Sequence, residues 1–462
     1  MTPERSMETS IIILAAGQGT RMRSNLPKVL HPLAGRPLLR HVIDTALALR
    51  PRAVQIVVGH AADAVRATFA DEAVQWVEQA EQLGTGHAVA QALPAIPDGD
   101  RVLILYGDVP LIEAATLRRL LDAAGDGLAL LTAELDDATG YGRILRDAHG
   151  AITGIVEHND ADEAQRRINE INTGFMACTA ARLRGWLARL NNANAKGEYY
   201  LTDIVAMAVA EGVVPAGCRA VVEAEVLGVN DRAQLAALER ICQRRLADAL
   251  MRDGATLADP ARVDVRGRVT TGRDCFIDVN VLFEGEVTLG EGVTIGPGCI
   301  LRDVRVGDGV EIRAHCLLDS ARIGAGAVIG PFARIRPETE IGDGVHIGNF
   351  VEVKKSSIGR GSKVNHLSYI GDTTMGAGVN VGAGTITCNY DGANKHPTHI
   401  ADDVFIGSDT QLIAPVKVGV GATIGAGTTV TRDVPAGELA VSRVPQVNRG
   451  GWKRPVKRKP AD

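Results

Sequence analysis

An aliphatic residue recurs at every sixth position through most of the segment 287–430, and glycine usually follows it. The clearest positions are Ile323, Ile329, Ile335, Ile341, Ile347 and Val353, and then Ile406, Leu412, Val418, Ile424 and Val430. A period of six fits neither a helix, with a period of about 3.6, nor one long strand, with a period of about two. It is typical of very short strands whose coils stack into a solenoid. The segment is therefore predicted to be a parallel β-helix, with the aliphatic side chains inside and the glycines in turn conformations that a side chain disfavours.

The first half of the chain instead alternates short apolar runs with amphipathic segments. The runs predict strands and the segments predict helices, in the order Ile11–Ala15, Leu38–Leu49, Val54–Val58, Ala61–Phe69, Val102–Leu105 and Ala114–Ala124. This alternation indicates an α/β fold with a mostly parallel sheet and helices on both faces. Ligands of such sheets bind beyond the carboxyl ends of the strands, so we expect the chemistry just after each apolar run.

Between these two regions, residues 231–252 predict one long helix. Its apolar positions are Leu235, Leu238, Ile241, Leu246 and Leu250. A glycine and a proline follow shortly after it, as expected where a helix ends. The sequence thus predicts three parts: a domain over residues 1–230, a linker helix over 231–252 and a repeat domain over 253–462.

Composition narrows the class of protein. The chain has 462 residues, too many for one compact core, and a net charge of −5, which gives no reason to expect nucleic-acid binding. Its basic end, Arg449–Lys459, is interpreted as a solvated tail. Seven cysteines without a Cys-x-x-Cys pair argue against a disulfide framework and a zinc ribbon, and favour a reducing cytoplasm. The first apolar run, residues 11–16, is too short to span a membrane, so we expect neither a signal peptide nor an anchor.

The first strand is followed by a glycine-rich loop, Gly17-Gln18-Gly19, and then by Arg21 and Lys28. Two glycines at the end of a strand let the backbone approach a phosphate chain, and the two cations can offset the charge on leaving pyrophosphate. Taken alone, the same residues also fit a tight turn with surface cations. A dinucleotide-binding loop is a further alternative, but Met22 stands where its third glycine belongs.

Two later stretches add to this loop. Asp108 ends a buried strand in Tyr106-Gly107-Asp108, where a carboxylate suits Mg²⁺ against phosphate oxygens, or merely orders the turn before Pro110. The stretch from Gln79 to Gly86 offers side-chain and backbone amides of the kind that bind the edge of a nucleobase, although by itself it is also an ordinary helix start.

The repeat tract carries its own chemical residues. Val353 is an inward position, so the neighbouring Glu352 and Lys354 are expected to face outward. A coil of three strands takes about eighteen residues, which brings Tyr369 beside Glu352 on the next coil, with His366 nearby. Without other evidence, such residues make a charged and solvated exterior. The six-residue pattern breaks between about Thr387 and Asp403, and an insertion in a solenoid forms a projecting loop, commonly on a binding face.

In the order and spacing of these motifs, nearly the whole chain resembles one family. It is similar to the sugar-1-phosphate nucleotidyltransferases, and within them to the bacterial bifunctional UDP-N-acetylglucosamine pyrophosphorylases and glucosamine-1-phosphate N-acetyltransferases. The resemblance implies a Rossmann-like nucleotidyltransferase domain followed by a left-handed parallel β-helix of hexapeptide repeats. Gln18 departs from the family, whose members often carry lysine there, and one phosphate contact is thereby removed.

The resemblance implies site residues for uridylyl transfer. Arg21 and Lys28 would contact the UTP phosphates, and Asp108 with Asn230 would bind Mg²⁺. The residues implied to bind UTP and the UDP-sugar are Leu14, Ala15, Ala16, Gly17, Lys28, Gln79, Gly84, Thr85, Tyr106, Gly107, Asp108, Gly142, Glu157, Asn172 and Asn230. The implied reaction is in-line attack of N-acetylglucosamine-1-phosphate on the α-phosphorus of UTP, helped by positioning and charge.

For acetyl transfer, the resemblance makes His366 the general base, with Glu352 nearby. Glucosamine's amine is largely protonated in neutral water and must lose a proton before it attacks the thioester, a task that suits an imidazole. The residues implied to bind the sugar phosphate are Arg336, Lys354, Tyr369, Asn380 and Lys395. Those implied to line the acetyl-CoA groove are Asn389, Tyr390, Ser408, Ala426 and Arg443.

The family also implies partners and a role. The expected co-substrates are acetyl-CoA and UTP, with Mg²⁺ as the cofactor, and the expected product is a precursor of cell wall and lipopolysaccharide. The expected assembly is a homotrimer through the β-helix in the cytoplasm, without nucleic-acid or membrane partners. Its insertion, Asn389–Lys395, would reach a neighbouring solenoid.

Two other functions are compatible with parts of the sequence. A zinc enzyme of the γ-carbonic-anhydrase type would use histidines on such a solenoid, and it would need three ligands and an open position. The histidines in that region are His346, His366, His396 and His399. A regulatory subunit that keeps both folds without catalysis is the other alternative, and the intact Lys28, Asp108, Asn230 and His366 argue against it.

Overall fold

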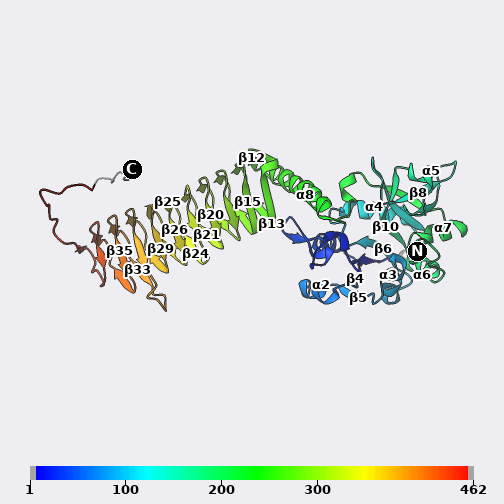
Figure 1. Ribbon diagram of the computed structural model, residues 1–462, viewed down its shortest axis with the longest axis horizontal. Coiled ribbons are helices and arrows are strands. Elements are labelled where there is room, and N and C mark those ends of the chain that lie inside the picture. Colours follow the sequence, from blue (N-terminus) through cyan, green and yellow to red (C-terminus); the bar gives the residue numbers. More distant parts are fainter. Residues whose placement is uncertain (1–6, 456–462) are drawn as a thin grey trace, which may run out of the picture. The chain divides into compact units, whose positions relative to one another are not determined.

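The computed structural model describes residues 7–455, and the chain divides into two compact units between Arg245 and Leu246 (Figure 1). The division falls inside helix α8 (Arg232–Arg252). The last residues of the basic tail, from 456 onward, lie outside the described part.

The N-terminal unit is built on a sheet whose main path runs in the order β11-β7-β10-β6-β1-β4-β5. Its strands are β1 (Thr9–Leu14), β4 (Ala53–Val58), β5 (Gln75–Glu78), β6 (Arg101–Tyr106), β7 (Leu128–Glu134), β10 (Glu170–Thr179) and β11 (Ala216–Arg219), with β8 (Gly142–Arg146) and β9 (Ile152–Val156) attached beside β10. The pairs β1–β4, β1–β6, β4–β5 and β7–β11 are parallel, and β10 is antiparallel to its neighbours. The predicted mostly parallel sheet is confirmed.

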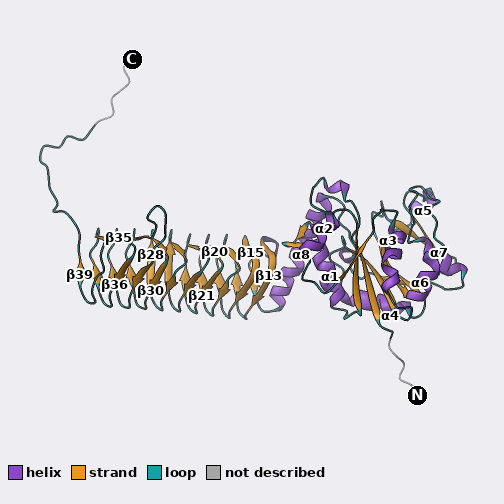
Figure 2. Cartoon of the chain, turned by 90° about the horizontal axis from the view of Figure 1, so that it is seen from below, coloured by secondary structure: helices purple, strands orange, loops and turns teal. Residues whose placement is uncertain are grey.

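Helices cover both faces of this sheet (Figure 2). Alternate residues of β1 face opposite sides: Ile11 and Ile13 belong to one buried cluster, and Ile12 and Leu14 to the other. The first cluster includes residues of α1 (Leu38–Leu47), α2 (Ala62–Thr68) and α4 (Ala114–Ala124); the second includes residues of α3 (Thr85–Ala92), α6 (Ala180–Leu187) and α7 (Asp203–Ala210). Because β1 is apolar on both faces, it lies in the middle of the sheet.

Shorter elements connect these. They are η1 (Thr20–Met22), η2 (Lys28–Leu30), β2 (Pro32–Leu33), β3 (Arg36–Pro37), η3 (Leu93–Ala95), α5 (Glu163–Arg166) and η4 (Glu223–Glu225). Two of them, η1 and η2, follow β1 directly and carry the predicted phosphate-binding cations Arg21 and Lys28.

The C-terminal unit is a parallel β-helix with three sides, seen as a stack of coils in Figures 1 and 2. Side 1 holds β12 (Thr256–Leu257), β14 (Phe276–Ile277), β16 (Thr294–Ile295), β19 (Glu311–Ile312), β22 (Val328–Ile329), β25 (His346–Asn349), β28 (Lys363–His366), β31 (Asn380–Val381), β34 (Phe405–Ile406), β37 (Thr423–Ile424) and β39 (Leu439–Ala440). Every pairing along this side is parallel.

The other two sides share one sheet. It begins with the longer strands β13 (Val263–Thr271), preceded by η5 (Pro260–Arg262), and β15 (Val281–Leu289). Side 2 continues with β17 (Ile300–Arg302), β20 (Leu317–Asp319), β23 (Arg334–Ile335), β26 (Glu352–Lys354), β29 (Tyr369–Gly371), β32 (Ile386–Cys388), β35 (Gln411–Ile413) and β38 (Thr429–Val430). Side 3 holds β18 (Arg305–Val306), β21 (Ala321–Ile323), β24 (Thr339–Ile341), β27 (Ser357–Ile358), β30 (Thr373–Met375), β33 (Thr398–Ile400) and β36 (Val416–Val418).

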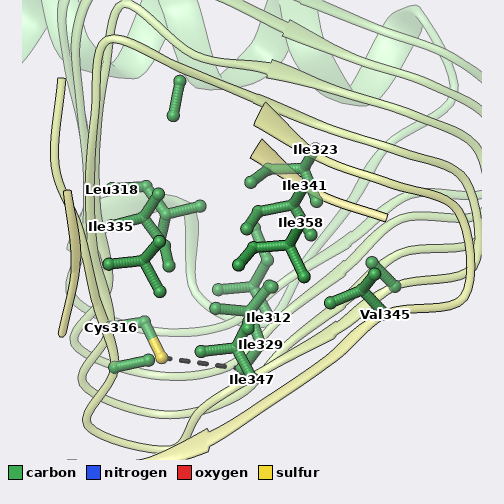
Figure 3. Packing of buried hydrophobic residues seen from close by; sticks show 14 of the residues in the cluster. Ile312, Cys316, Leu318, Ile323, Ile329, Ile335, Ile341, Val345, Ile347 and Ile358 are labelled. Carbon is green, nitrogen blue, oxygen red and sulfur yellow. Dashed lines mark hydrogen bonds between the residues drawn. The ribbon is translucent and has the colours of Figure 1, made fainter. Parts of the chain in front are cut away.

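The solenoid core consists of aliphatic side chains stacked from coil to coil. Figure 3 shows one column per side: Ile312, Ile329 and Ile347 on side 1, Leu318 and Ile335 on side 2, and Ile323, Ile341 and Ile358 on side 3. Paired residues are 17 or 18 positions apart, as in Ile312–Ile329 and Ile329–Ile347. All the inward positions read from the six-residue pattern are at most 4% exposed, which confirms the predicted β-helix.

The glycine that follows each inward residue serves a different purpose from the one predicted. Gly359 does not adopt a positive φ; a Cβ there would lie 2.4 Å from the backbone carbon of Gly376 on the next coil. The left-handed turn position comes two residues later, at Gly361, with a φ of 71°. The first glycine of each Gly-x-Gly is therefore required for close stacking of coils, and the second for the turn.

The interruption of the repeat is also shorter than predicted. Thr387 lies in β32 as a fully buried inward residue, and Thr398 to Ile400 form β33. Partners across this coil are 25 positions apart, as in Thr374–His399, against 17 for Ser357–Thr374 on the coil before. The insertion is thus confined to residues 389–397, because the strands on either side keep their pairing.

The structure bears on two of the expectations from composition. All seven cysteines are free. Within residues 7–455, no helix combines the length and the apolar character needed to cross a bilayer.

The two glycine positions differ in the substitution they should tolerate. Gly359→Ala should destabilise the solenoid by about 1–3 kcal/mol, because the added methyl meets the backbone of the next coil, which cannot move aside. Gly361→Asn should cost less than about 1 kcal/mol, since the site is open and Asn tolerates a left-handed backbone. Thermal unfolding of both full-length variants shows which one loses more stability. Equal losses of stability would contradict the stacking role of Gly359.

Candidate functional site

A pocket of about 300 Å³ opens at the carboxyl ends of the central strands in the N-terminal unit. Predicted UTP-binding residues that line it are Leu14, Ala15, Ala16, Gly17, Lys28, Gln79, Gly84, Thr85, Tyr106 and Asp108. Gly107 lies just behind it, where its N–H donates to the carbonyl of Leu14. Gln82, of the predicted base-binding stretch, also lines the pocket, together with three residues that had no role assigned from sequence: Val29, Ala88 and Glu198. Glu198 comes from a distant loop, and no local pattern marks it.

The glycine-rich loop is shaped to place Lys28. Gly19 has a φ of 62°, and a Cβ on it would lie 2.6 Å from the Cβ of Lys28. The Nζ of Lys28 lies 2.5 Å from the Oδ2 of Asp108, and both side chains are mostly buried. The lysine thus offsets the aspartate charge at the end of β6, within reach of any phosphate bound in the pocket.

Asp108 and Asn230 approach each other through the backbone. The N–H of Val229 donates to the carbonyl of Asp108 at 2.9 Å, which brings the loop 228–230 beside the end of β6. Arg21 donates to the Oδ1 of Asn230 at 2.9 Å. One carboxylate and one carboxamide oxygen are hard ligands of the kind that Mg²⁺ accepts together with phosphate oxygens and water, so the residues fit such an ion.

The opposite end of the pocket contains amide groups. Gln79 is 3% exposed, and its Nε2 donates to the carbonyl of Gly84 at 3.1 Å and approaches the Nδ1 of His87. Gln82 in turn donates to the carbonyl of Gln79. Gly84 has a φ of 109°, and a Cβ there would collide with the backbone of Tyr199. This rigid wall of amides suits the polar edge of a planar base.

Gly142, Glu157 and Asn172 form a second group next to this pocket. Asn172 of β10 pairs with Gly142 of β8, and a Cβ on Gly142 would lie 3.6 Å from both carboxylate oxygens of Glu157. Tyr106 lies between this group and the pocket. Burial raises the pKa of its phenol, and the charges of Glu157 and Asp108 raise it further. The three residues therefore lie near Tyr106, although they are not part of the lining of the pocket.

Glu157 itself is held in a largely buried site. Burial raises the pKa of its carboxyl, and the hydrogen bond from the Thr202 hydroxyl, at 3.1 Å, opposes that rise. Thr202 is a further residue that the sequence analysis did not single out.

On side 2 of the β-helix, charged residues gather on successive coils. Glu352 and Tyr369 are register partners, as the eighteen-residue coil suggested, although their separation is 17 positions. Arg336 pairs with Glu352 at 2.8 Å. The ammonium groups of Lys354 and Lys395 approach closely enough that Lys354 lowers the pKa of Lys395. Two adjacent cations form an arrangement that an anion would stabilise.

His366 lies at the corner between sides 1 and 2. Its Nδ1 is 3.2 Å from the Oδ1 of Asn349, which occupies the equivalent position on the preceding coil. The side chain is exposed. Asn349 was not assigned a role from sequence, although its position 17 residues before His366 could have marked it.

One chain does not bring all the predicted acetyltransferase residues together. Asn380 lies on side 1, where it pairs with Lys363 and Phe405, whereas Lys354 and Tyr369 lie on side 2. Ser408 and Ala426 occupy the corner between sides 1 and 2 on consecutive coils, and the guanidinium of Arg443 lies over Gly425 beside them. Asn389 and Tyr390 begin the insertion at the other end of side 2.

A larger groove of about 760 Å³ runs along side 3. Of the residues assigned from sequence, Lys395 lines it, together with charged side chains such as Arg305, Arg322 and Glu340. Its lining carries both signs of charge and gives no comparable indication of a ligand.

Within the described part of one chain, the histidines named for a zinc site lie apart. His346 lies on side 1 and His399 on side 3, while His396 pairs with Asp391 inside the insertion at 2.7 Å. Among residues 7–455 there is no group of three or more His, Cys, Asp or Glu side chains that could hold a metal ion.

Comparison with known proteins covers both units. Residues 11–202 match the model of the MobA-like NTP transferase domain, and residues 320–355 and 397–432 match that of the bacterial transferase hexapeptide, six repeats. Proteins named bifunctional protein GlmU are similar over the full length. Those of Alkalilimnicola ehrlichii and Aromatoleum aromaticum are 60% and 59% identical, over 97% of this chain and 97% and 99% of theirs. The protein of an Azoarcus species is 58% identical over 97% of this chain and all of its own.

The buried carboxyl of Glu157 makes a prediction about stability and pH. Because the pKa of Glu157 is raised on folding, its ionisation costs stability as the pH rises above about 4.5. The glutamine in Glu157→Gln cannot ionise, so the melting temperature of this variant should rise relative to that of the wild type between pH 4 and pH 8. Each kcal/mol of unfolding free energy corresponds to about 2–4 °C. Calorimetry against Asp71→Asn, an exposed control, checks this; a pH-independent difference would contradict it.

Proposed function

We propose that this chain, which belongs to the family of bifunctional GlmU proteins, acetylates glucosamine-1-phosphate with acetyl-CoA and then couples the product to UTP. The products are UDP-N-acetylglucosamine and pyrophosphate, and the role is supply of precursors for cell wall and lipopolysaccharide. The observation that carries the proposal is the identity of 58–60% to GlmU proteins across 97% of the chain, with both the NTP transferase and the hexapeptide models matched.

Uridylyl transfer is assigned to the N-terminal domain, residues 1–230. A phosphate oxygen of N-acetylglucosamine-1-phosphate attacks the α-phosphorus of UTP, and the bond to pyrophosphate breaks. The nucleophile is already an anion and needs no general base, so the protein contributes positioning and positive charge. Lys28, held between Gly19 and Asp108, and Arg21, held on Asn230, are the cations nearest the phosphates.

The remaining residues of this site orient the two substrates. The amides around Gln79, Gly84 and Thr85 bind the uracil edge, while Gly142, Glu157 and Asn172 bind the sugar beyond Tyr106. Glu157, held by Thr202, is an acceptor for sugar hydroxyls.

Mg²⁺ is the proposed cofactor, bound by Asp108 and Asn230. When bound, it neutralises charge on the phosphate oxygens. What supports it is the pair of hard oxygen ligands brought together by the Val229–Asp108 hydrogen bond. Lys28 contacts Asp108, and Arg21 contacts Asn230. When substrate binds, the two cations exchange these contacts for contacts with the phosphates.

Acetyl transfer is assigned to residues 253–462, with residues 231–252 as the linker helix. The amine of glucosamine-1-phosphate attacks the thioester carbonyl and its proton passes to His366; the carbon–sulfur bond breaks, and the thiolate of CoA leaves and takes up a proton from the imidazolium. Asn349 bonds one ring nitrogen of His366, and the other nitrogen is then directed at the amine. The sugar phosphate binds at Lys354 and Lys395, whose mutual repulsion it relieves, with Arg336 and Tyr369 beside them.

The acetyl-CoA groove is proposed along the corner between sides 1 and 2. Ser408, Ala426 and Arg443 lie there on consecutive coils beyond His366. Asn389 and Tyr390 lie at the other end of side 2, so a neighbouring copy would supply them to this groove. A homotrimer is proposed because Asn380 lies on a different side from Lys354 and Tyr369, so that a second copy would supply it. The seven free cysteines support a reducing compartment such as the cytoplasm.

Exposed apolar residues at the same corner also support the trimer. Phe332, Phe350 and Leu367 are 48%, 57% and 63% exposed, although each adopts a positive φ that bulky residues disfavour. Phe350 stacks on Phe332, with ring centroids 5.4 Å apart. Glycine or aspartate occupies this corner on later coils, at Gly384 and Asp409, so the fold itself does not require aromatic side chains there.

Separate inactivation of the two sites tests the main proposal. His366→Ala should lower acetyl transfer by about 10²-fold or more and leave uridylyl transfer nearly intact, while Asp108→Ala should do the reverse. The assay supplies glucosamine-1-phosphate, acetyl-CoA, UTP and Mg²⁺ and measures UDP-N-acetylglucosamine, then omits acetyl-CoA. Loss of both activities from either substitution in folded protein would disprove the two-site assignment.

Phe350→Gly tests the trimer at the apolar corner. Glycine fits the positive φ and removes the exposed ring, so the fold should keep its stability while the trimer dissociates. Sedimentation at micromolar concentration should show a fall in mass, with acetyl transfer reduced and uridylyl transfer kept. Val420→Ser, at a residue 54% exposed outside this column, is the control. An unchanged trimer in Phe350→Gly would refute this interface.

A further inference from the structure

The insertion 389–397 carries residues of both proposed acetyltransferase subsites, Asn389 and Tyr390 for acetyl-CoA and Lys395 for the sugar phosphate. Its two ends leave the coil at Cys388 and return at Thr398. The position of the insertion therefore depends on the contacts that its two ends make with the preceding coil.

Asp372 contacts both ends of the insertion. Its Oδ2 accepts a hydrogen bond from the Nδ2 of Asn389 at 2.5 Å, at the first residue of the insertion. Its backbone carbonyl accepts the N–H of Thr398 at 3.1 Å, just after the last. The carboxylate charge also reaches Lys395, where it opposes the effect of Lys354.

The surroundings of Asp372 are built for this contact. A Cβ on the neighbouring Gly371 would lie 2.4 Å from the Tyr369 hydroxyl and 2.7 Å from the Asn389 Nδ2, so the space that glycine leaves is where the two polar groups meet. The Nδ2 of Asn389 is also 3.4 Å from that hydroxyl. The N–H of Gly371 donates to the hydroxyl of Thr387, an inward position that is otherwise apolar on this side of the solenoid.

We propose that Asp372 is a positioning residue for acetyl transfer, which holds Asn389 and the base of the insertion so that the sugar-phosphate and acetyl-CoA subsites keep a fixed separation. The proposal rests on the acetyltransferase function assigned above. Asp372 is not a base in the reaction; it acts through Asn389, Tyr369 and Lys395.

Two substitutions separate the hydrogen bond from the charge. Asp372 has a φ of 48°, which glycine and asparagine both tolerate. Asp372→Gly removes the side chain but keeps the backbone bond to Thr398, and should raise the KM for both substrates of acetyl transfer and lower kcat/KM by about tenfold or more. Asp372→Asn keeps an acceptor for Asn389 and should remain within about threefold of the wild type.

A matched control lies at the same corner of the solenoid. Asp303 has a φ of 51°, its Oδ1 accepts the N–H of Glu286, and it lies four coils before Asp372. Asp303→Gly should leave acetyl transfer within about twofold. Uridylyl transfer should be unchanged in all three variants, and the pH profile of kcat for acetyl transfer should keep its midpoint, because His366 is untouched.

Two further measurements distinguish positioning from a general structural role. In Asp372→Gly, but not in Asp303→Gly, the amides of residues 389–397 should exchange hydrogen faster. Combining Asp372→Gly with Asn389→Ala should add little to the loss from Asn389→Ala alone.

Unchanged exchange in Asp372→Gly, additive losses, or wild-type kinetics would overturn the proposal, and so would an Asp372→Asn variant as impaired as Asp372→Gly. Absence of acetyl transfer from the wild-type protein would instead refute the proposed function.

Discussion

The C-terminal half depends on one constraint, the parallel pairing of each coil with the coils before and after it. A short strand of two or three residues has too few hydrogen bonds to be stable alone. Seventeen or eighteen residues bring the chain back to the same point in most coils, so aliphatic residues such as Ile312, Ile329 and Ile347 stack on one another (Figure 3). Each buried side chain contributes about 1.5–3 kcal/mol, and the columns together hold the coils in register.

That register also explains where chemistry is placed on the solenoid. Because the inward positions are fixed, the residues on either side of Val353 or Ile370 must point outward, and residues one coil apart become neighbours. Glu352 and Tyr369 meet in this way, as do Asn349 and His366. The insertion lengthens one coil without changing the strand pairing, since Leu412 still stacks on Thr387. Its extra residues therefore project outside the core.

The N-terminal domain brings its candidate site residues together in a different way. Its parallel strands end together at one edge of the sheet, where the loops after β1 and β6 converge. Glycine allows close approach of chain segments at two points around the pocket: Gly19 leaves room for Lys28, and Gly84 leaves room for Tyr199. The result is a pocket in which cations lie near Asp108 at one end and amides line the other.

The sequence alone determined the fold of both halves, because periods of six and alternating apolar runs follow directly from which residues must be buried. Lys28, Asp108 and His366 received roles only through the resemblance of their motifs to a known family, because each alone also fits a surface cation, a turn or a solvated exterior. The sequence assigned the wrong role to the glycine after each inward residue, because a close approach between coils leaves the same signal as a turn. It extended the insertion to Thr387–Asp403, because threonine at an inward position does not look like core.

Only the tertiary structure showed which residues far apart in the sequence meet at the candidate sites. Glu198 and Thr202 reach their sites from elsewhere in the chain, and no local pattern indicates them. The pairing of Arg336 with Glu352, the contact of Lys354 with Lys395 and the hold of Asp372 on Asn389 depend on which coil lies beside which. Periodicity fixes which residues face outward, but the exact length of each coil, 17, 18 or 25 residues, decides which of them meet.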